Sequence, residues 1–416
     1  MSGVRNYILV TAAYWAFTLT DGALRMLVLL HFHHLGYTPV ELAFLFVFYE
    51  LFGVVTNLVG GFVAARLGLR ATLLGGLALQ VVALGMLSFL DPAWGRAMAV
   101  AYVMTAQALS GIAKDLTKMS AKSAIKVLVP EGADSSLFKW VAVLTGSKNA
   151  LKGVGFFLGG FLLGALEFRD SLLVMAAGIF VTLVLAAGSL PRELGKAKGK
   201  AKFSHLFSKS REINVLSAAR FFLFGARDIW FVVGVPVFLS TRFDWGFTEV
   251  GGFLAAWVIG YGVIQSITPL LLRRFTKGRA PQGRSAAVLA FLLAVVIGGV
   301  IVGVQAGYRA DLLVVFGLGL FGVVFAINSS VHSYLILAYS DGDKVAMNVG
   351  FYYMANAGGR LIGTVLSGLM YQEAGLVGCL AASAAFAAAA GLLAVFLPRT
   401  SEPVMLAEIA GADGGD

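Results

Sequence analysis

The chain has 416 residues, of which 59% are hydrophobic and only 13% are charged, and its formal net charge is +10. A soluble globular protein carries about 25% charged residues, so half that density cannot cover a water-facing surface of this size. The composition excludes a soluble enzyme, a disordered protein and a nucleic-acid-binding domain with a charged face, and it indicates a chain whose main solvent is lipid.

Long apolar segments follow one another along almost the whole chain. A membrane-spanning helix needs about 20 predominantly apolar residues, and longer segments tilt. Because these runs are continuously apolar and do not alternate, they predict helices rather than the strands of a barrel. We expect twelve spans, near residues 7–31, 40–64, 71–90, 97–112, 138–166, 172–190, 213–239, 250–272, 286–304, 312–338, 347–371 and 376–397.

Basic residues in the connections predict the orientation of these spans. Lys and Arg gather after even-numbered spans, in segments 66–70, 191–212 and 273–284, whereas the connections after odd-numbered spans hold no more than one arginine each. Beyond span four, lysines recur every four residues from Lys114 to Lys126, which makes one basic stripe on a helix. Cytoplasmic loops collect Lys and Arg, so we expect both chain termini in the cytoplasm.

The basic segment in the middle of the chain divides it into two similar halves. We predict a six-helix bundle over 1–190, a basic cytoplasmic linker over 191–212, a second six-helix bundle over 213–398 and an acidic cytoplasmic tail over 399–416. Gly-Tyr-Thr at 36–38 and Gly-Phe-Thr at 246–248 lie at corresponding places in the two halves. Duplicated six-helix halves around a midplane site describe a secondary transporter. We therefore predict an all-α membrane protein with twelve transmembrane helices and the major facilitator fold.

A loop motif follows span two. The segment 61–70 reads GFVAARLGLR and resembles the major facilitator loop signature Gly-x-x-x-Asp-Arg-x-Gly-Arg-Arg/Lys, which Gly61, Arg66, Gly68 and Arg70 match. The resemblance implies a cytoplasmic gate, in which Arg near a helix end binds carbonyls or acids in one conformation and releases them in the other. Ala65 stands where the signature has Asp, so the usual charge relay is in doubt. The alternative is an ordinary basic cytoplasmic loop.

Ionisable residues within the spans are the strongest functional signal, because such residues are costly in a membrane and usually face a cavity. Asp21 and Arg25 lie one helical turn apart in the first span, so they can pair. Basic side chains nevertheless outnumber acidic ones inside the spans, and the surplus suits a multiply charged anion, to which Arg offers a fork and Lys a point charge. The alternative is a set of internal salt bridges that locks the two halves together.

These charges, with nearby polar side chains, make up the predicted site. The basic residues expected to bind substrate are Arg25, Lys148, Lys152, Arg227 and Arg360, in a set that also includes Arg220. The polar residues expected to supply hydrogen bonds are Asn149, Asn328, Asn356 and Tyr353. The acidic residues Asp21, Glu50 and Asp228 are candidates for charge pairs or proton coupling, although a carboxylate beside Arg resists protonation. The coupling ion, or its absence in a uniporter, is left open.

Several kinds of chemistry have no support in the sequence. The chain has no Gly-x-x-x-x-Gly-Lys-Ser/Thr motif and therefore no ATP-hydrolysing P-loop of its own, so an ion gradient or the substrate gradient must drive transport. No spacing of ligands predicts a metal site, and we expect His31, His33 and His34 to form an interfacial polar cap. We expect no enzymatic activity, no cofactor and no nucleic-acid partner.

Five segments carry a more specific resemblance. They read YWAFTLTDGALRM at 14–26, ALSGIAKDL at 108–116, KMSAKSAIK at 118–126, LTGSKNALKG at 144–153 and FGARD at 224–228. Together they resemble the organoarsenical efflux permease (ArsJ) family of the major facilitator superfamily, over nearly the whole chain. The resemblance implies export of 1-arseno-3-phosphoglycerate across a bacterial inner membrane, and so arsenate resistance. It also implies functional pairing with the glyceraldehyde-3-phosphate dehydrogenase that makes this compound from arsenate.

The residues themselves leave other functions open. Sugar phosphates, phosphoglycerate and aromatic acids fit a cationic cavity equally well, and charge does not reveal direction. An importer or exchanger of organic phosphates or other organic anions is therefore the alternative. A non-transporting receptor or assembly factor is a third class, in which every buried charge is paired and no cavity is open. We expect a monomer whose partners are the small anionic substrate and membrane lipid.

Overall fold

The computed structural model describes residues 2–128, 134–191, 210–275, 281–340 and 345–398, and it excludes from description the side chains of 2–4, 60–67, 122–128, 134–146, 273–275, 311 and 345–347. Helices make up nearly all of the described part, and it contains no strand. Most of the predicted linker 191–212 and the whole predicted tail 399–416 lie outside the described residues.

Eleven helices are defined within the described residues. They are α1 (Ser2–His34), α2 (Pro39–Leu67), α3 (Leu69–Ser88), α4 (Arg96–Leu128), α5 (Asp134–Ser189), α6 (Arg211–Phe231), α7 (Gly234–Arg242), α8 (Phe247–Phe275), α9 (Gly283–Gln305), α10 (Ala310–Ala338) and α11 (Val345–Val395). Eight helical segments of the described part are long and apolar enough to cross a membrane, and two of them, 147–189 and 348–395, have 43 and 48 residues, enough to cross twice. With the more polar α1 and α4, these segments correspond to the twelve predicted spans.

The long helices bend at defined residues. Backbone of non-helical conformation interrupts α5 at Glu167 (φ 61°) and α11 at Gly375 (φ 59°), so each element consists of two membrane segments. A further break separates α6 from α7. There the backbone amides of Val233 and Gly234 both donate to the Ser367 hydroxyl of α11, at 3.1 Å each. One side chain therefore satisfies two backbone groups that the break frees inside the membrane.

Corresponding helices of the two halves begin in the same way. At the start of α2 the Thr38 amide donates to Glu41 at 2.7 Å, and the Glu41 amide donates back to the Thr38 hydroxyl at 3.3 Å. This reciprocal pair is a capping box, which satisfies two free amides of the helix terminus. At the start of α8 the Gly246 amide donates to Glu249 at 2.7 Å in the equivalent place. The short repeats noted in the sequence thus mark equivalent helix starts.

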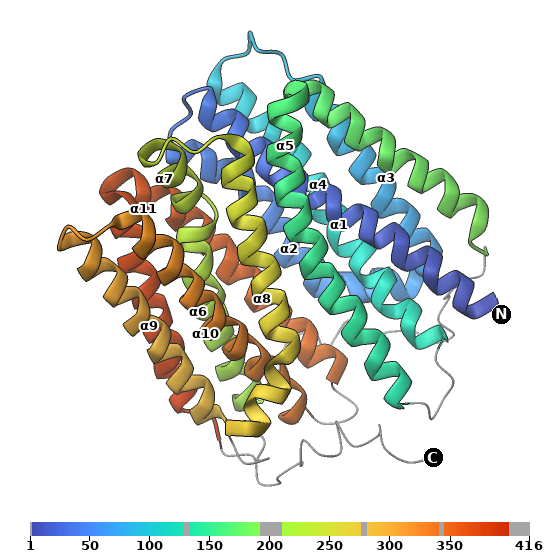
Figure 1. The fold of residues 1–416 in the computed structure, drawn as a ribbon. Coiled ribbons are helices and arrows are strands. Elements are labelled where there is room, and N and C mark those ends of the chain that lie inside the picture. The colour runs from blue at the N-terminus through green and yellow to red at the C-terminus, as the bar shows by residue number, and fades with distance from the viewer. Residues whose placement is uncertain (1, 129–133, 192–209, 276–280, 341–344, 399–416) are drawn as a thin grey trace.

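The helices form two bundles that lie side by side, α1–α5 and α6–α11 (Figure 1). Within each bundle one glycine-rich helix packs closely on another, as small residues allow in membranes. A Cβ atom on Gly159 of α5 would lie 2.2 Å from the carbonyl oxygen of Ala23 in α1. A Cβ atom on Gly359 of α11 would lie 2.0 Å from the carbonyl oxygen of Phe221 in α6. The same pairing is therefore repeated in the second bundle.

The two bundles touch through α5 with α8 and through α2 with α11. The contact is tight at the end of the molecule where α2 and α8 begin. A Cβ atom on Gly160 would lie 2.3 Å from the carbonyl oxygen of Phe247, and one on Gly368 would lie 2.5 Å from that of Pro39. These four residues define what we name the packed end. In the predicted orientation the packed end faces the outside of the cell.

Candidate functional site

Two adjoining cavities lie between the bundles. The first, of about 200 Å³, is lined from α1, α5, α6, α8, α10 and α11. Its charged and polar lining consists of Arg25, Lys148, Asn149, Lys152, Arg220, Arg227, Asp228, Tyr261, Gln265, Ser333, Tyr353, Asn356 and Arg360. Aromatic side chains of the C-terminal bundle, among them Phe224 and Trp257, line its other side. Both bundles therefore contribute cations to the same cavity.

The second cavity, of about 180 Å³, is lined mainly from the N-terminal bundle and from α11. It shares Lys148, Lys152, Tyr353, Asn356 and Arg360 with the first cavity. Its other charged and polar lining residues are Tyr14, Thr18, Asp21, Asn57, Lys114, Asp115 and Lys118. Because one set of side chains lines both cavities, we treat them as two parts of one candidate site.

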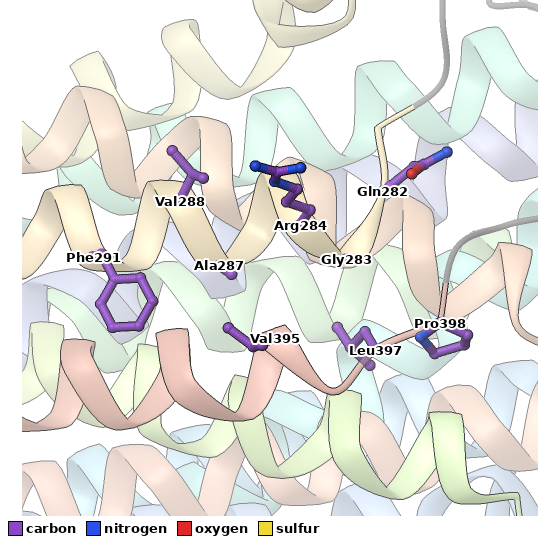
Figure 2. A pocket seen from close by; sticks show the side chains of 9 residues that line it. All are labelled: Gln282, Gly283, Arg284, Ala287, Val288, Phe291, Val395, Leu397 and Pro398. Carbon is purple, nitrogen blue, oxygen red and sulfur yellow. The ribbon is translucent and has the colours of Figure 1, made fainter.

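A third hollow, which shares no lining residue with these cavities, lies between the start of α9 and the end of α11 (Figure 2). It measures about 320 Å³, and apolar side chains such as Val288, Phe291 and Val395 form most of its wall. Arg284 is the charged residue among its lining, and it is exposed. None of the predicted site residues reaches this hollow, so its greater size does not make it the candidate site.

A network of ion pairs crosses between the bundles beside the cavities. Glu50 of α2, which is fully buried, accepts hydrogen bonds from Arg25 of α1 at 3.1 Å and from Arg360 of α11 at 2.6 Å. Arg360 also donates to Asp228 of α6 at 3.1 Å, and Asp228 accepts from Arg227 at 2.6 Å. Three arginines thus share two carboxylates, and Arg360 is the member that joins the two bundles.

The structure gives Arg25 a different partner from the one that helical spacing suggests. Arg25 pairs with Glu50 rather than with Asp21, and its guanidinium lies 5.1 Å from the Phe46 ring centroid and 5.7 Å from that of Tyr49. Asp21 instead accepts a hydrogen bond from the Tyr49 hydroxyl at 2.7 Å. The expected Asp21–Arg25 pair is therefore wrong, because α2 offers both residues partners that a single-helix argument cannot see.

Two cations of the first cavity have no acidic partner within the described part of the chain. Lys152 makes no ion pair there, and its ammonium lies 5.6 Å from the Phe156 ring centroid. Arg220 donates to Asn356 at 3.0 Å and to Ser329, and its guanidinium lies 3.9 Å from the Phe224 ring centroid. These side chains, with the arginine surplus of the network, give the cavity an excess of positive charge.

The polar residues that the sequence proposed fall into two groups. Asn149, Asn356 and Tyr353 line the cavities, and Asn149 donates to Gln265 of α8 at 3.0 Å. Asn328 of α10 is fully buried and is not part of the wall of either cavity, so the structure does not bring it to the site.

A buried acid on α4 belongs to the second cavity but escaped the sequence prediction. Asp115 is fully buried, accepts from the Thr56 hydroxyl at 2.6 Å and pairs with Lys118 at 2.5 Å. The fourth span was expected to end near residue 112, with the lysines beyond it in a cytoplasmic stripe. The helix α4 continues to Leu128, as the stripe implied, but Lys114 and Lys118 line the second cavity. The signal for this was Asp115 itself, an acid that interrupts a basic stripe.

Two other sequence features can be placed. Of the loop motif, the side chains of Gly61 and Arg66 lie outside the described residues. Gly68 precedes α3 with φ 82°, a left-handed conformation that glycine adopts readily, and Arg70 donates to the Ala187 carbonyl at 2.7 Å. Near the end of α1, the rings of His31 and Phe168 stack at 3.9 Å between centroids. The described residues contain no group of three or more His, Cys, Asp or Glu that could hold a metal ion.

Comparisons with known proteins fit this architecture. Residues 8–336 match the family model described as Major Facilitator Superfamily. Two solved structures are each described as a POT family transporter, one in complex with 5-aminolevulinic acid and one with a thioalcohol conjugated peptide. Their TM-scores are 0.74 and 0.75, and each is 14% identical over 96% of this chain and 97% of its own. No curated protein matches. The likeness confirms the predicted fold, an all-α multi-pass membrane protein with two helical bundles.

Proposed function

The chain belongs to the major facilitator superfamily and is a secondary transporter rather than an enzyme, and we propose that its substrate is a small organic anion. The observation that supports an anion is the surplus of cations in the cavities between the bundles. Cations from both bundles face the same space, so a bound anion would contact both halves at once. Such a substrate couples its own binding to the relative position of the bundles, which alternating access requires.

The chemistry of the lining supports an anion with more than one charged group. Arg25 and Arg227 stand on corresponding helices of the two bundles, and their guanidiniums offer planar forks that match phosphate or carboxylate. Lys152 adds a point charge that both cavities share. The two connected spaces together suit a compact molecule with an anionic group at each end, one held from each bundle.

We further propose that the physiological substrate is an organic arsenate-phosphate, 1-arseno-3-phosphoglycerate, and that its export confers arsenate resistance. The resemblance to the organoarsenical efflux permease family supports this choice. All five segments that carry that resemblance, at 14–26, 108–116, 118–126, 144–153 and 224–228, supply residues to the cavity walls. A glyceraldehyde-3-phosphate dehydrogenase would make the substrate and so act as the functional partner.

The membrane placement belongs to the same proposal. We propose a monomer in a bacterial inner membrane with both termini in the cytoplasm, bundles at 1–190 and 213–398, the basic linker 191–212 between them and the acidic tail 399–416 after them. The asymmetric distribution of Lys and Arg among the connections supports this orientation.

Transport into membrane vesicles tests the proposal. The dehydrogenase, its oxidant NAD⁺, glyceraldehyde-3-phosphate and arsenate are supplied outside everted vesicles, and we expect arsenic to accumulate inside only when all four are present. Omission of the dehydrogenase should abolish accumulation, because arsenate alone is not the substrate. Accumulation only in right-side-out vesicles would establish import in place of export. If neither orientation takes up this compound or 3-phosphoglycerate, an organic-anion transporter is refuted.

A lysine variant tests whether the transported substrate binds in the cavity. Lys152→Met removes a cation that lines both cavities, so we expect the half-saturating substrate concentration to rise roughly 10-fold to 150-fold, the usual weight of a hydrogen bond to a charged group. Arg96→Met is the control, because Arg96 forms an exposed ion pair with Glu41 at 3.5 Å, away from the cavities. Unchanged transport by the lysine variant would remove Lys152 from the site.

A further inference from the structure

One carboxylate lines the cationic cavity without forming an ion pair with any described residue. Asp21 lines the second cavity, is 7% exposed and accepts one hydrogen bond, from Tyr49 to its Oδ1 atom. The other buried acids beside the cavities are held by cations. Glu50 binds two arginines, Asp228 binds two arginines and Asp115 binds Lys118. Within the described part of the chain, Asp21 alone among these four makes no ion pair.

A purely structural role does not account for this arrangement. Buried charges are as a rule paired, because an unpaired charge in a low-dielectric interior is strongly unfavourable. The second oxygen of Asp21, Oδ2, accepts no hydrogen bond from the described residues, and it is not among the side-chain atoms sealed from solvent. That oxygen is therefore an acceptor presented to the cavity.

The surroundings of Asp21 limit what it can accept. The charged and titratable groups that line the second cavity with it are Tyr14 on α1, Lys114, Asp115 and Lys118 on α4, Lys148 and Lys152 on α5, and Tyr353 and Arg360 on α11, while the Tyr49 hydroxyl of α2 donates to it. A ligand ammonium placed at Asp21 would meet these cations and be repelled. A neutral hydroxyl would donate to the carboxylate without that penalty.

We infer that Asp21 determines specificity, by accepting a hydrogen bond from a hydroxyl group of the transported anion. This inference rests on the proposed function and narrows it, since the substrate class becomes organic anions that carry a hydroxyl group next to their anionic groups. The lysines and arginines bind the anionic groups, and Asp21 accepts a hydrogen bond from the hydroxyl group between them. A site built to bind a hydroxyl discriminates strongly against an analogue that lacks it, because its polar group is then left without a partner. The carboxylate adds repulsion against anions that bring no donor.

Two ligands that differ in a single hydroxyl test the inference. The purified full-length protein in lipid nanodiscs is titrated with 3-phosphoglycerate and with 3-phosphonooxypropanoate, which has the same charged groups and no hydroxyl. We expect wild type to bind the hydroxylated ligand roughly 10-fold to 150-fold more tightly, the range for one hydrogen bond to a charged group. Equal affinities for wild type overturn the inference without any variant. If neither ligand binds, the proposed function fails first, which keeps the two failures distinct.

Two variants distinguish a direct contact of Asp21 with the ligand from a general effect of negative charge in the cavity. Asp21→Ala removes the acceptor and should bring the affinity ratio of the two ligands close to one. Asp115→Ala removes the same charge from the same cavity but from a carboxylate already held by Lys118, so the ratio should stay as in wild type. A ratio that survives in Asp21→Ala, or that falls equally in both variants, overturns the assignment. Phosphoserine, with an ammonium in place of the hydroxyl, should bind more weakly than 3-phosphoglycerate, and tighter binding also overturns it.

Discussion

Arg360 offers the sharpest test of how the bundles are held together. It is the one member of the ion-pair network that contacts carboxylates of both bundles, Glu50 at 2.6 Å and Asp228 at 3.1 Å. Loss of one partner of a buried ion pair typically destabilises a protein by about 3–5 kcal/mol. In Arg360→Met each carboxylate keeps a second arginine, so we expect a smaller loss, about 1.5–3 kcal/mol, the value of a hydrogen bond to a charged group.

This loss should act on the equilibrium between conformations. Separation of the bundles at the packed end pulls α2 from α11 and must stretch the bond between Glu50 and Arg360. The substitution removes a bond of the closed form, so the open form should gain roughly 10-fold to 150-fold in relative population. A cysteine at Ala43 reports this opening, because Ala43 is 2% exposed and packs beside Gly368. The native Cys379 is fully buried and adds little background.

The measurement is the rate at which a membrane-impermeant maleimide labels Ala43→Cys in proteoliposomes. The rate should rise by the factor given above in the Arg360→Met background. In the Arg96→Met background it should change less than about fivefold, since an exposed ion pair contributes only about 0–1 kcal/mol. An unchanged labelling rate in a correctly inserted Arg360→Met protein would refute the idea that this network holds the bundles in the closed position.

Two further substitutions probe the backbone contacts. Gly160→Ala should reduce the transport rate to less than a tenth, because its Cβ atom would lie 2.3 Å from the Phe247 carbonyl oxygen and hold the packed end apart. Gly164→Ala is the control and should transport normally, because the atom nearest to its Cβ would lie 3.9 Å away. Equal transport rates in the two variants would contradict the role of the packed end. Ser367→Ala leaves two buried amides at the α6–α7 break without an acceptor, so it should lower the free energy of unfolding by about 1–3 kcal/mol. Denaturation in detergent measures this change, and an unaltered midpoint of the unfolding transition would contradict it.

The sequence predicted the helices well, because a membrane leaves few alternatives. Backbone groups in lipid must be satisfied internally, so a long apolar run becomes a helix whatever its neighbours are. The place of the basic stripe beyond span four was harder to predict. The stripe was assigned to a cytoplasmic helix, whereas Lys114 and Lys118 line the second cavity between the bundles. Hydropathy measures how strongly a residue prefers lipid to water, but it does not show whether the side chain faces lipid or a cavity.

The pairing of charges was much harder to predict than their presence in the spans. Helical spacing shows that Asp21 and Arg25 are neighbours on one helix, but it cannot show that α2 brings Glu50 closer to Arg25. The burial of Asp115 was overlooked because its partner on α2, Thr56, comes within hydrogen-bonding distance only when α2 and α4 pack together. The position of an ionisable residue can be read from one helix, whereas its partner depends on the packing of several.

The imbalance of three arginines to two carboxylates affects the energetics of a transport cycle. Lys152 and Arg220 add to this imbalance, so the vacant site carries a net positive charge, and a bound organic anion offsets that charge. A transmembrane voltage, which acts on a charge with about 2.3 kcal/mol per 100 mV for a full crossing, therefore pulls the vacant form more strongly than the occupied form. In a cell with a negative interior, the vacant carrier is drawn back inward, and the bound anion lowers the electrical cost of the outward step. The electrical gradient alone can then bias the cycle toward efflux, without a co-transported ion.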